Sequence, residues 1–153
     1  RLEDWLRVQT ERDGIIADPS ALPWSGVAVF KRTVAEFGAR GLRARPLAAA
    51  IRHHLHWSEL IGGEVVITLP SAWQKRFNAS SIEVRPRIDD PVPYVDELCA
   101  AFPDFTRAYE PDGLAVADFD TWGPTVRTLR AFVVSYRELL RLVTDAHLPN
   151  PDA

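Results

Sequence analysis

The clearest helical pattern in the sequence lies in residues 25–40, where apolar side chains recur every three or four positions. This spacing predicts an amphipathic helix with one apolar face, formed by Val27, Phe30, Val34 and Phe37. Ser25 is placed to cap the free N–H groups at the start of this helix, and Gly41 predicts its end. A shorter amphipathic stretch, residues 1–9, precedes it and carries Leu2, Trp5 and Leu6 at helical spacing.

Two segments have the composition of strands. Residues 64–70 form a continuous apolar run between turn signals, typical of a parallel strand buried on both faces. Residues 42–51 form a second candidate, which Pro46 weakens. Short helices are predicted over 54–61 and 71–77, so the order is helix–strand–helix–strand–helix, that of an α/β fold with a parallel sheet. Two parallel strands cannot close a barrel and leave open edges, which indicates that further strands lie upstream of this chain.

The second half of the chain, residues 78–153, differs in composition from the first half. Residues 78–123 are rich in proline, aspartate and aromatic residues, and we expect an irregular arm on the domain surface. Residues 124–146 predict a long amphipathic helix that begins with Pro124, a position that tolerates proline. Its expected buried stripe consists of Val126, Leu129, Val133, Tyr136, Leu140 and Val143. Residues 147–153 form a tail, and the whole chain is expected to be one incomplete domain.

Composition and charge exclude several classes of partner. The chain has 153 residues, of which 46% are hydrophobic and 25% charged, as in a globular domain. The net charge is −3, so neither a basic footprint for nucleic acid nor a polybasic membrane patch is expected. No apolar run approaches the ~20 residues of a membrane span. We therefore expect neither nucleic-acid nor membrane partners.

The single cysteine and the absence of methionine indicate in which cellular compartment the protein lies and whether the chain is a piece of a longer protein. Cys99 is the single cysteine and cannot form an internal disulfide, so a reducing, cytoplasmic setting is expected. The chain contains no methionine and begins at Arg1. This pattern favours a C-terminal piece of a longer protein, and a processed or trimmed chain is the alternative.

Three of the four histidines lie in residues 47–60, LAAAIRHHLHWSEL. His53 and His56 could share a helix face, whereas His54 would point elsewhere and His147 lies in the tail. A zinc site needs three or four convergent ligands, and the sequence has neither an HExxH nor a paired CxxC motif. A metal site is therefore disfavoured, while pocket hydrogen-bond donors and plain surface histidines both remain open.

Arg52 follows a strand of small residues and precedes a helix. In a parallel α/β fold this position is the carboxyl end of the sheet, where ligands bind. A guanidinium group there suits a phosphate or carboxylate, and a salt bridge to Glu59 is the structural alternative. Lys75 could be considered as a Schiff-base lysine, but a solvated helix face explains it better. The sequence contains no recognisable Ser/His/Asp triad or glycine-rich phosphate loop.

Four segments, in order and spacing, resemble the transaldolase family. RLEDW at residues 1–5 resembles the end of the motif Ser-Pro-Phe-Val-Gly-Arg-Ile-x-Asp-Trp, and AAAIRHH at 48–54 resembles the strand end Gly-Ala-Ser-Phe-Arg-Asn. LIGGEVVITLP at 60–70 resembles the family's final barrel strand, and residues 122–143 resemble its C-terminal helix. The segment 78–118 matches least well and is closer to a transaldolase-like bacterial subgroup.

The resemblance implies a fold and an activity. Transaldolases are (β/α)₈ TIM barrels that transfer a dihydroxyacetone unit between sugar phosphates through a lysine Schiff base, without a metal or organic cofactor. Residues 1–77 would then supply the last strands and helices of such a barrel, and the catalytic lysine would lie upstream, so no catalytic residue is expected in this chain. Arg1 and Arg52 match the family's two phosphate-binding arginines. Ala50 replaces a phosphate-binding serine, and His53 stands in place of an asparagine and could supply a replacement donor.

The sequence thus favours the C-terminal, phosphate-binding portion of a transaldolase-like transferase of carbohydrate metabolism, which would need its missing N-terminal barrel portion on the same or a separate chain. The alternative is a non-catalytic module, derived from such a barrel, that binds a phosphorylated ligand or a partner protein. A metalloenzyme that uses the histidine cluster is a third and weaker hypothesis.

Overall fold

The chain divides into two compact units, which we describe separately. The computed structural model describes residues 1–148 and residue 151. Unit 1 is Arg1–Leu114 and unit 2 is Ala115–Ala153. The boundary between the two units lies inside the segment 78–123 that was predicted as an irregular arm.

Two helices begin unit 1, in the positions where the hydrophobic pattern predicted them. Helix α1 spans Leu2–Asp13 and ends at Gly14, whose φ of +67° suits glycine. Helix α2 spans Leu22–Ala39 and is followed by Gly41 at φ +61°, which confirms the predicted stop. Ser25 is not the N-cap, because the helix begins three residues earlier. Its buried hydroxyl donates a 2.7 Å hydrogen bond to the Leu22 carbonyl.

A short parallel strand pair follows α2. Strand β1 (Leu47–Ala48) pairs in parallel with β2 (Val66–Ile67), in the register Leu47↔Val66 and Ala48↔Ile67. Helix α3 (Leu55–Ser58) lies between the strands in sequence, and α4 (Ser71–Asn78) follows them. The predicted order and parallel pairing are confirmed. The strands are far shorter than predicted, and β2 is only half-buried, so the described residues form a mainly helical α/β unit and no barrel.

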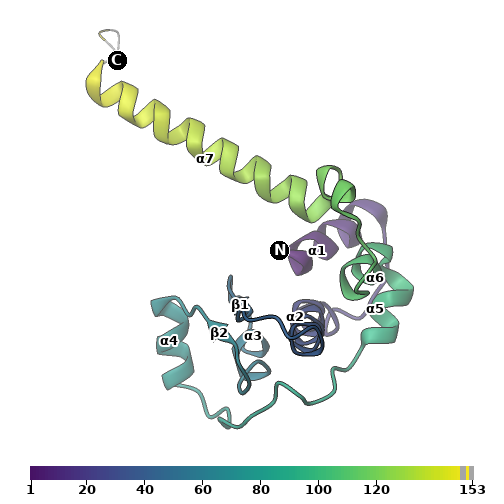
Figure 1. Cartoon of the computed structure of the whole chain (residues 1–153). Helices are drawn as coiled ribbons and strands as arrows, with labels where there is room; N and C mark the ends of the chain where they lie inside the picture. Colours follow the sequence, from purple (N-terminus) through teal and green to yellow (C-terminus); the bar gives the residue numbers. More distant parts are fainter. Residues whose placement is uncertain (149–150, 152–153) are drawn as a thin grey trace. The chain divides into compact units, whose positions relative to one another are not determined.

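Residues 95–109 are the largest correction to the sequence prediction. This part of the expected irregular arm forms α5 (Val95–Ala101) and α6 (Pro103–Tyr109). Helix α2 contacts α1, α3, α5 and α6 and lies at the centre of the unit (Figure 1). Proline does not break this segment because Pro103 occupies the first turn of α6, where its missing N–H costs nothing.

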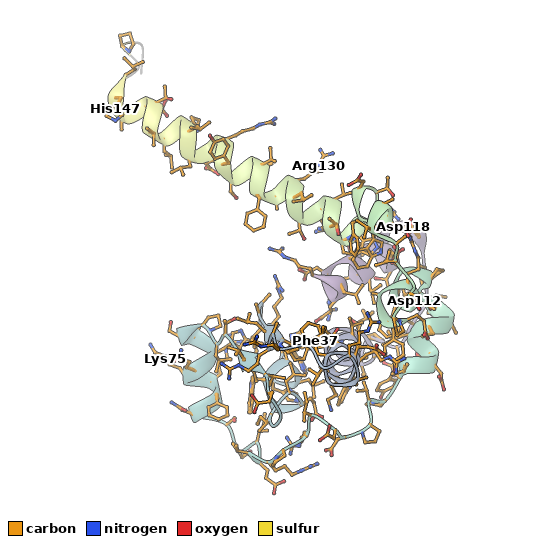
Figure 2. The ribbon with its side chains drawn as sticks, in the orientation of Figure 1. Phe37, Lys75, Asp112, Asp118, Arg130 and His147 are labelled. Atoms are coloured by element: carbon orange, nitrogen blue, oxygen red, sulfur yellow. The ribbon has the colours of Figure 1, made fainter. Side chains whose placement is uncertain are left out.

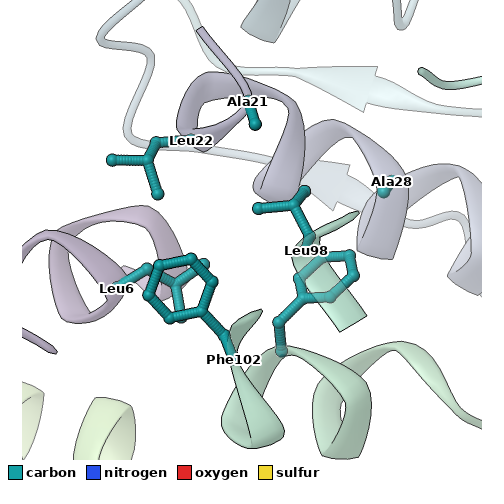
Figure 3. Packing of buried hydrophobic residues seen from close by; sticks show 7 residues of the cluster. Leu6, Ala21, Leu22, Ala28, Leu98 and Phe102 are labelled. Atoms are coloured by element: carbon teal, nitrogen blue, oxygen red, sulfur yellow. The ribbon is translucent and has the colours of Figure 1, made fainter. Parts of the chain in front are cut away.

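Two hydrophobic clusters stabilise unit 1. Core cluster 1 joins α1, α2, α5 and α6 and consists of Leu6, Ala21, Leu22, Ala28, Leu98, Phe102 and Phe105, all of which except Phe105 are labelled in Figure 3. Core cluster 2 lies beneath the strand pair and consists of Val27, Ala48, Leu60 and Ile88. Burial of apolar area is the dominant stabilising term in folding, so α5 and α6 are part of the core rather than a covering arm.

Unit 2 consists mainly of one long helix. A 3₁₀ helix, Val116–Asp120, precedes α7 (Gly123–His147), which has Pro124 in its first turn as predicted. Figure 2 shows α7 with Arg130 and His147 labelled. The stripe predicted to be buried is largely exposed, at Leu129, Val133, Tyr136, Leu140 and Val143. Within the described part of unit 2, the 3₁₀ helix is the one other element available to cover α7. Of the predicted tail, residues 149–150 and 152–153 lie outside the described residues.

No helix in the described part of the chain has both the length and the apolar composition needed to cross a membrane.

Candidate functional site

A small pocket in unit 1 brings together three of the four residues singled out from the sequence. It lies between the start of α1, the face of α2 and the segment that follows β1, and its volume is about 100 Å³. Arg1, Ala50 and Arg52 contribute to its lining, whereas His53 does not. The other lining residues are Leu2, Glu3, Gly26, Val27, Phe30, Ala48, Ala49, Ile51, His56 and Leu60.

Arg52 is held by an acidic residue of α1. One terminal nitrogen, Nη2, lies 3.3 Å from the Asp4 Oδ2, and Nη1 donates a 3.2 Å hydrogen bond to the Ala50 carbonyl. The side chain of Arg52 remains 43% exposed. Since a guanidinium group has five N–H donors, it can accept an anion while these contacts persist. The ion pair that we considered with Glu59 is not formed, because Glu59 pairs with Lys31 and Arg87 instead.

Ala50 adopts an uncommon backbone conformation at the carboxyl end of β1. Its φ of +60° lies in the left-handed region, which costs an L-residue roughly 1–2 kcal/mol. Residues held in such conformations cluster at ligand-binding positions. The turn at Ala50 directs the chain out of the strand and places Arg52 beside α1.

His56 makes three polar contacts around the pocket. Its Nε2 lies 3.1 Å from the Glu3 Oε2 and 3.2 Å from the Pro23 carbonyl oxygen. Its Nδ1 accepts a 3.3 Å hydrogen bond from the backbone N–H of Arg52. The His56 and Glu3 side chains are only 14% and 12% exposed. One imidazole ring therefore links α1, α2 and the segment after β1.

Glu3 is the charged partner of this network. Burial alone would raise the pKa of Glu3, but the hydrogen bonds from His56 and Arg7 outweigh it and lower the pKa from 4.5 to about 2. Arg7 donates to the other carboxylate oxygen at 2.7 Å. Because the pKa is lowered in the folded state, this contribution to stability is present above about pH 4.5 and is lost as the pH falls toward 2.

His53 and His54 lie beside the pocket rather than in it. Their rings are 4.2 Å apart between centroids, and the Nδ1 of His53 accepts a 3.3 Å hydrogen bond from the Leu55 N–H. Burial lowers the pKa of His53, and the neighbouring His54 and His56 lower it further. His147 ends α7 in unit 2. No group of three or more His, Cys, Asp or Glu side chains suited to a metal ion occurs within residues 1–148 and 151.

The two lysines of the chain lie outside the pocket lining. Lys75 is exposed on α4, as the sequence indicated (Figure 2). Lys31 is buried on α2 and donates to the carbonyl oxygens of Arg87 at 2.6 Å and Asp90 at 3.0 Å. Burial lowers the pKa of Lys31, and the nearby Glu59 opposes this shift.

Glu3 and Asp4 were not predicted from the sequence as parts of the site, and which of the three clustered histidines enters the pocket was left open; the structure places His56 there. A signal existed for Glu3, since Glu3 and Arg7 are four residues apart on one helix face. No local pattern pairs Asp4 with Arg52, which lie 48 positions apart in the sequence and meet only after folding.

Comparison of the chain with family models, with curated proteins and with solved structures gives no match.

Proposed function

We propose that the pocket of Arg1 and Arg52 binds the phosphate group of a sugar phosphate, and that the chain supplies the phosphate-binding side of a transaldolase-like enzyme. In this proposal, unit 1 contributes the last part of a (β/α)₈ barrel. A lysine upstream of the chain forms the Schiff base through which a dihydroxyacetone unit is transferred. No cofactor takes part.

The observation that supports this proposal is the common pocket of two arginines 51 positions apart in sequence. Arg52 follows the carboxyl end of a parallel strand, the end of a sheet at which ligands bind in α/β folds. The pocket has a volume of about 100 Å³, well above the roughly 10–15 Å³ that one water molecule needs, so a small anion can enter it. Guanidinium groups suit phosphate because they donate two parallel hydrogen bonds.

The proposal predicts that Arg52→Gln weakens binding of fructose 6-phosphate to the chain about 10- to 150-fold. A charge-assisted hydrogen bond contributes roughly 1.5–3 kcal/mol, and each 1.4 kcal/mol is tenfold in affinity. Isothermal titration calorimetry measures this loss, with free fructose as the ligand that lacks the phosphate. Arg40→Gln is the matched control, because Arg40 is exposed and pairs with Glu36 away from the pocket.

A second variant in the same assay changes the affinity in the opposite direction. Asp4→Asn removes the negative charge that competes with the phosphate for Arg52, so the affinity rises severalfold. Asp13 lies on the same helix and pairs with Arg12 away from the pocket. The control variant Asp13→Asn is therefore expected to leave the affinity unchanged. Equal affinity of wild type and Arg52→Gln, or equal binding of fructose and its phosphate, contradicts the assignment of the site.

A second candidate function is a non-catalytic module that binds a phosphorylated ligand or a partner protein. It is favoured by one observation: neither Lys31 nor Lys75 lines the pocket, and the Lys31 ammonium is occupied by two carbonyl groups and Glu59. Both candidates predict phosphate binding at Arg52. They differ in whether a lysine elsewhere in the complete polypeptide forms a covalent intermediate.

A further inference from the structure

We propose that His56 is the positioning residue of this pocket and makes its anion affinity dependent on pH. Its imidazole holds the backbone of Arg52 in place only while Nδ1 carries no proton. Anion binding therefore weakens when His56 takes up a second proton. This inference rests on the proposed function, because the anion is the phosphate group assigned to Arg52.

The hydrogen bonds of His56 admit one protonation state. The backbone N–H of Arg52 is a donor, so the Nδ1 that lies 3.3 Å away must supply a lone pair. The proton of the neutral ring is then on Nε2, which faces two acceptors, the Glu3 carboxylate at 3.1 Å and the Pro23 carbonyl at 3.2 Å. Every ring nitrogen therefore has a partner of the right kind in the neutral form.

A second proton creates a conflict on one side of the ring only. The new Nδ1–H would point at the Arg52 N–H, and two donors cannot share a hydrogen bond. On the other side, the imidazolium would pair more strongly with the Glu3 carboxylate. The ring therefore stays with α1, and the segment that carries Arg52 moves away from it. The guanidinium group loses its position in the pocket as a result.

The direction of the pH effect distinguishes the His56 contact from the effect of the surrounding charges. The titratable and charged groups around His56 are Arg1 at the start of the chain, Glu3 and Arg7 from α1, and Arg52, His53 and His54 from its own segment. The contact from α2 is the uncharged Pro23 carbonyl. Protonation of His53 and His54 adds positive charge and by itself would strengthen anion binding at low pH. The His56 contact predicts weaker binding at low pH, so the two effects have opposite signs.

The binding test uses sulfate, because sulfate remains a dianion across the range in which imidazole titrates, about pH 5 to 8. Wild-type affinity is expected to fall about three- to tenfold from pH 8 to pH 5, the effect of one lost hydrogen bond. In His56→Asn, the side-chain oxygen replaces Nδ1 as acceptor and cannot titrate, so binding at pH 8 is retained and the fall is absent. His54→Asn is the matched control: it keeps the fall, which becomes somewhat larger because the opposing charge of His54 is removed. A wild-type pH profile in His56→Asn overturns the inference.

A second readout does not depend on any ligand. The ¹H–¹⁵N resonance of the Arg52 amide is expected to shift, and its hydrogen exchange to accelerate, as the pH falls from about 8 to about 5. Both changes should be absent in His56→Asn. If Arg52→Gln leaves sulfate binding unchanged, the proposed function fails while this titration still tests His56. If the Arg52 amide does not respond to pH in the wild type, the inference fails whatever the ligand.

Discussion

Replacing Phe102 with alanine is expected to lower the free energy of unfolding of unit 1 by about 3–5 kcal/mol. Phe102 is fully buried in core cluster 1, between the end of α5 and the start of α6. Removing its ring leaves a cavity lined by side chains from α1, α2 and α5, which the backbone can fill only in part. Urea unfolding followed by far-UV circular dichroism measures the loss.

The control for this prediction is Ile16→Ala, because Ile16 is 95% exposed. Substitutions of exposed residues outside special contacts change stability by within about 0.5 kcal/mol. If Phe102→Ala were as mild as Ile16→Ala, α5 and α6 would be a dispensable arm. That result would restore the arrangement expected from composition alone.

Replacing Lys31 with methionine in the otherwise wild-type chain is expected to lower the free energy of unfolding by about 3–5 kcal/mol, because it removes one partner of a buried ion pair. The Lys31 Nζ lies 3.5 Å from the Glu59 carboxylate and donates to the carbonyl oxygens of Arg87 and Asp90. Without the ammonium group, the carboxylate keeps only the more distant Arg87, at 3.9 Å. The same unfolding assay measures the effect.

Lys75→Met is the matched control, because Lys75 is exposed on α4. The double variant Lys31→Met with Glu59→Leu should be less destabilised than the two single variants summed, since it removes the unpaired charge as well as its partner. Additive effects in this cycle would show that Lys31 and Glu59 do not interact.

The sequence predicted the helices of unit 1 best where an apolar stripe and an end signal agreed. Helix α2 has both, and its stripe ends just before Gly41. The pattern of α5 and α6 was also readable, since Leu98, Phe102, Phe105 and Tyr109 recur at helical spacing. The prolines and aspartates around them favoured a loop, but burial of these apolar side chains in the core outweighs that local preference and stabilises two helices. The exposed stripe of α7 was not predictable, because a periodic pattern indicates an apolar face without indicating what covers it.

The site was predictable in part. The position of Arg52 after a strand of small residues indicated a ligand-binding end of a sheet, and the structure does place Arg52 in a pocket. The choice among the histidines was not predictable, because it depends on a four-residue helix, α3, that turns His56 toward α1. His53 precedes that helix and instead bonds to the Leu55 N–H. The pairing of Arg52 with Asp4 depends on the packing of distant segments, which local spacing does not encode.

Chemical trapping of the Schiff base distinguishes the transaldolase-like enzyme from the non-catalytic module. The polypeptide encoded by the complete reading frame around residues 1–153 is incubated with fructose 6-phosphate, reduced with sodium borohydride and mapped by mass spectrometry. We expect a three-carbon adduct on a lysine outside residues 1–153, with release of glyceraldehyde 3-phosphate. Binding of the sugar phosphate without adduct or aldehyde would contradict the transaldolase-like proposal and favour the non-catalytic module.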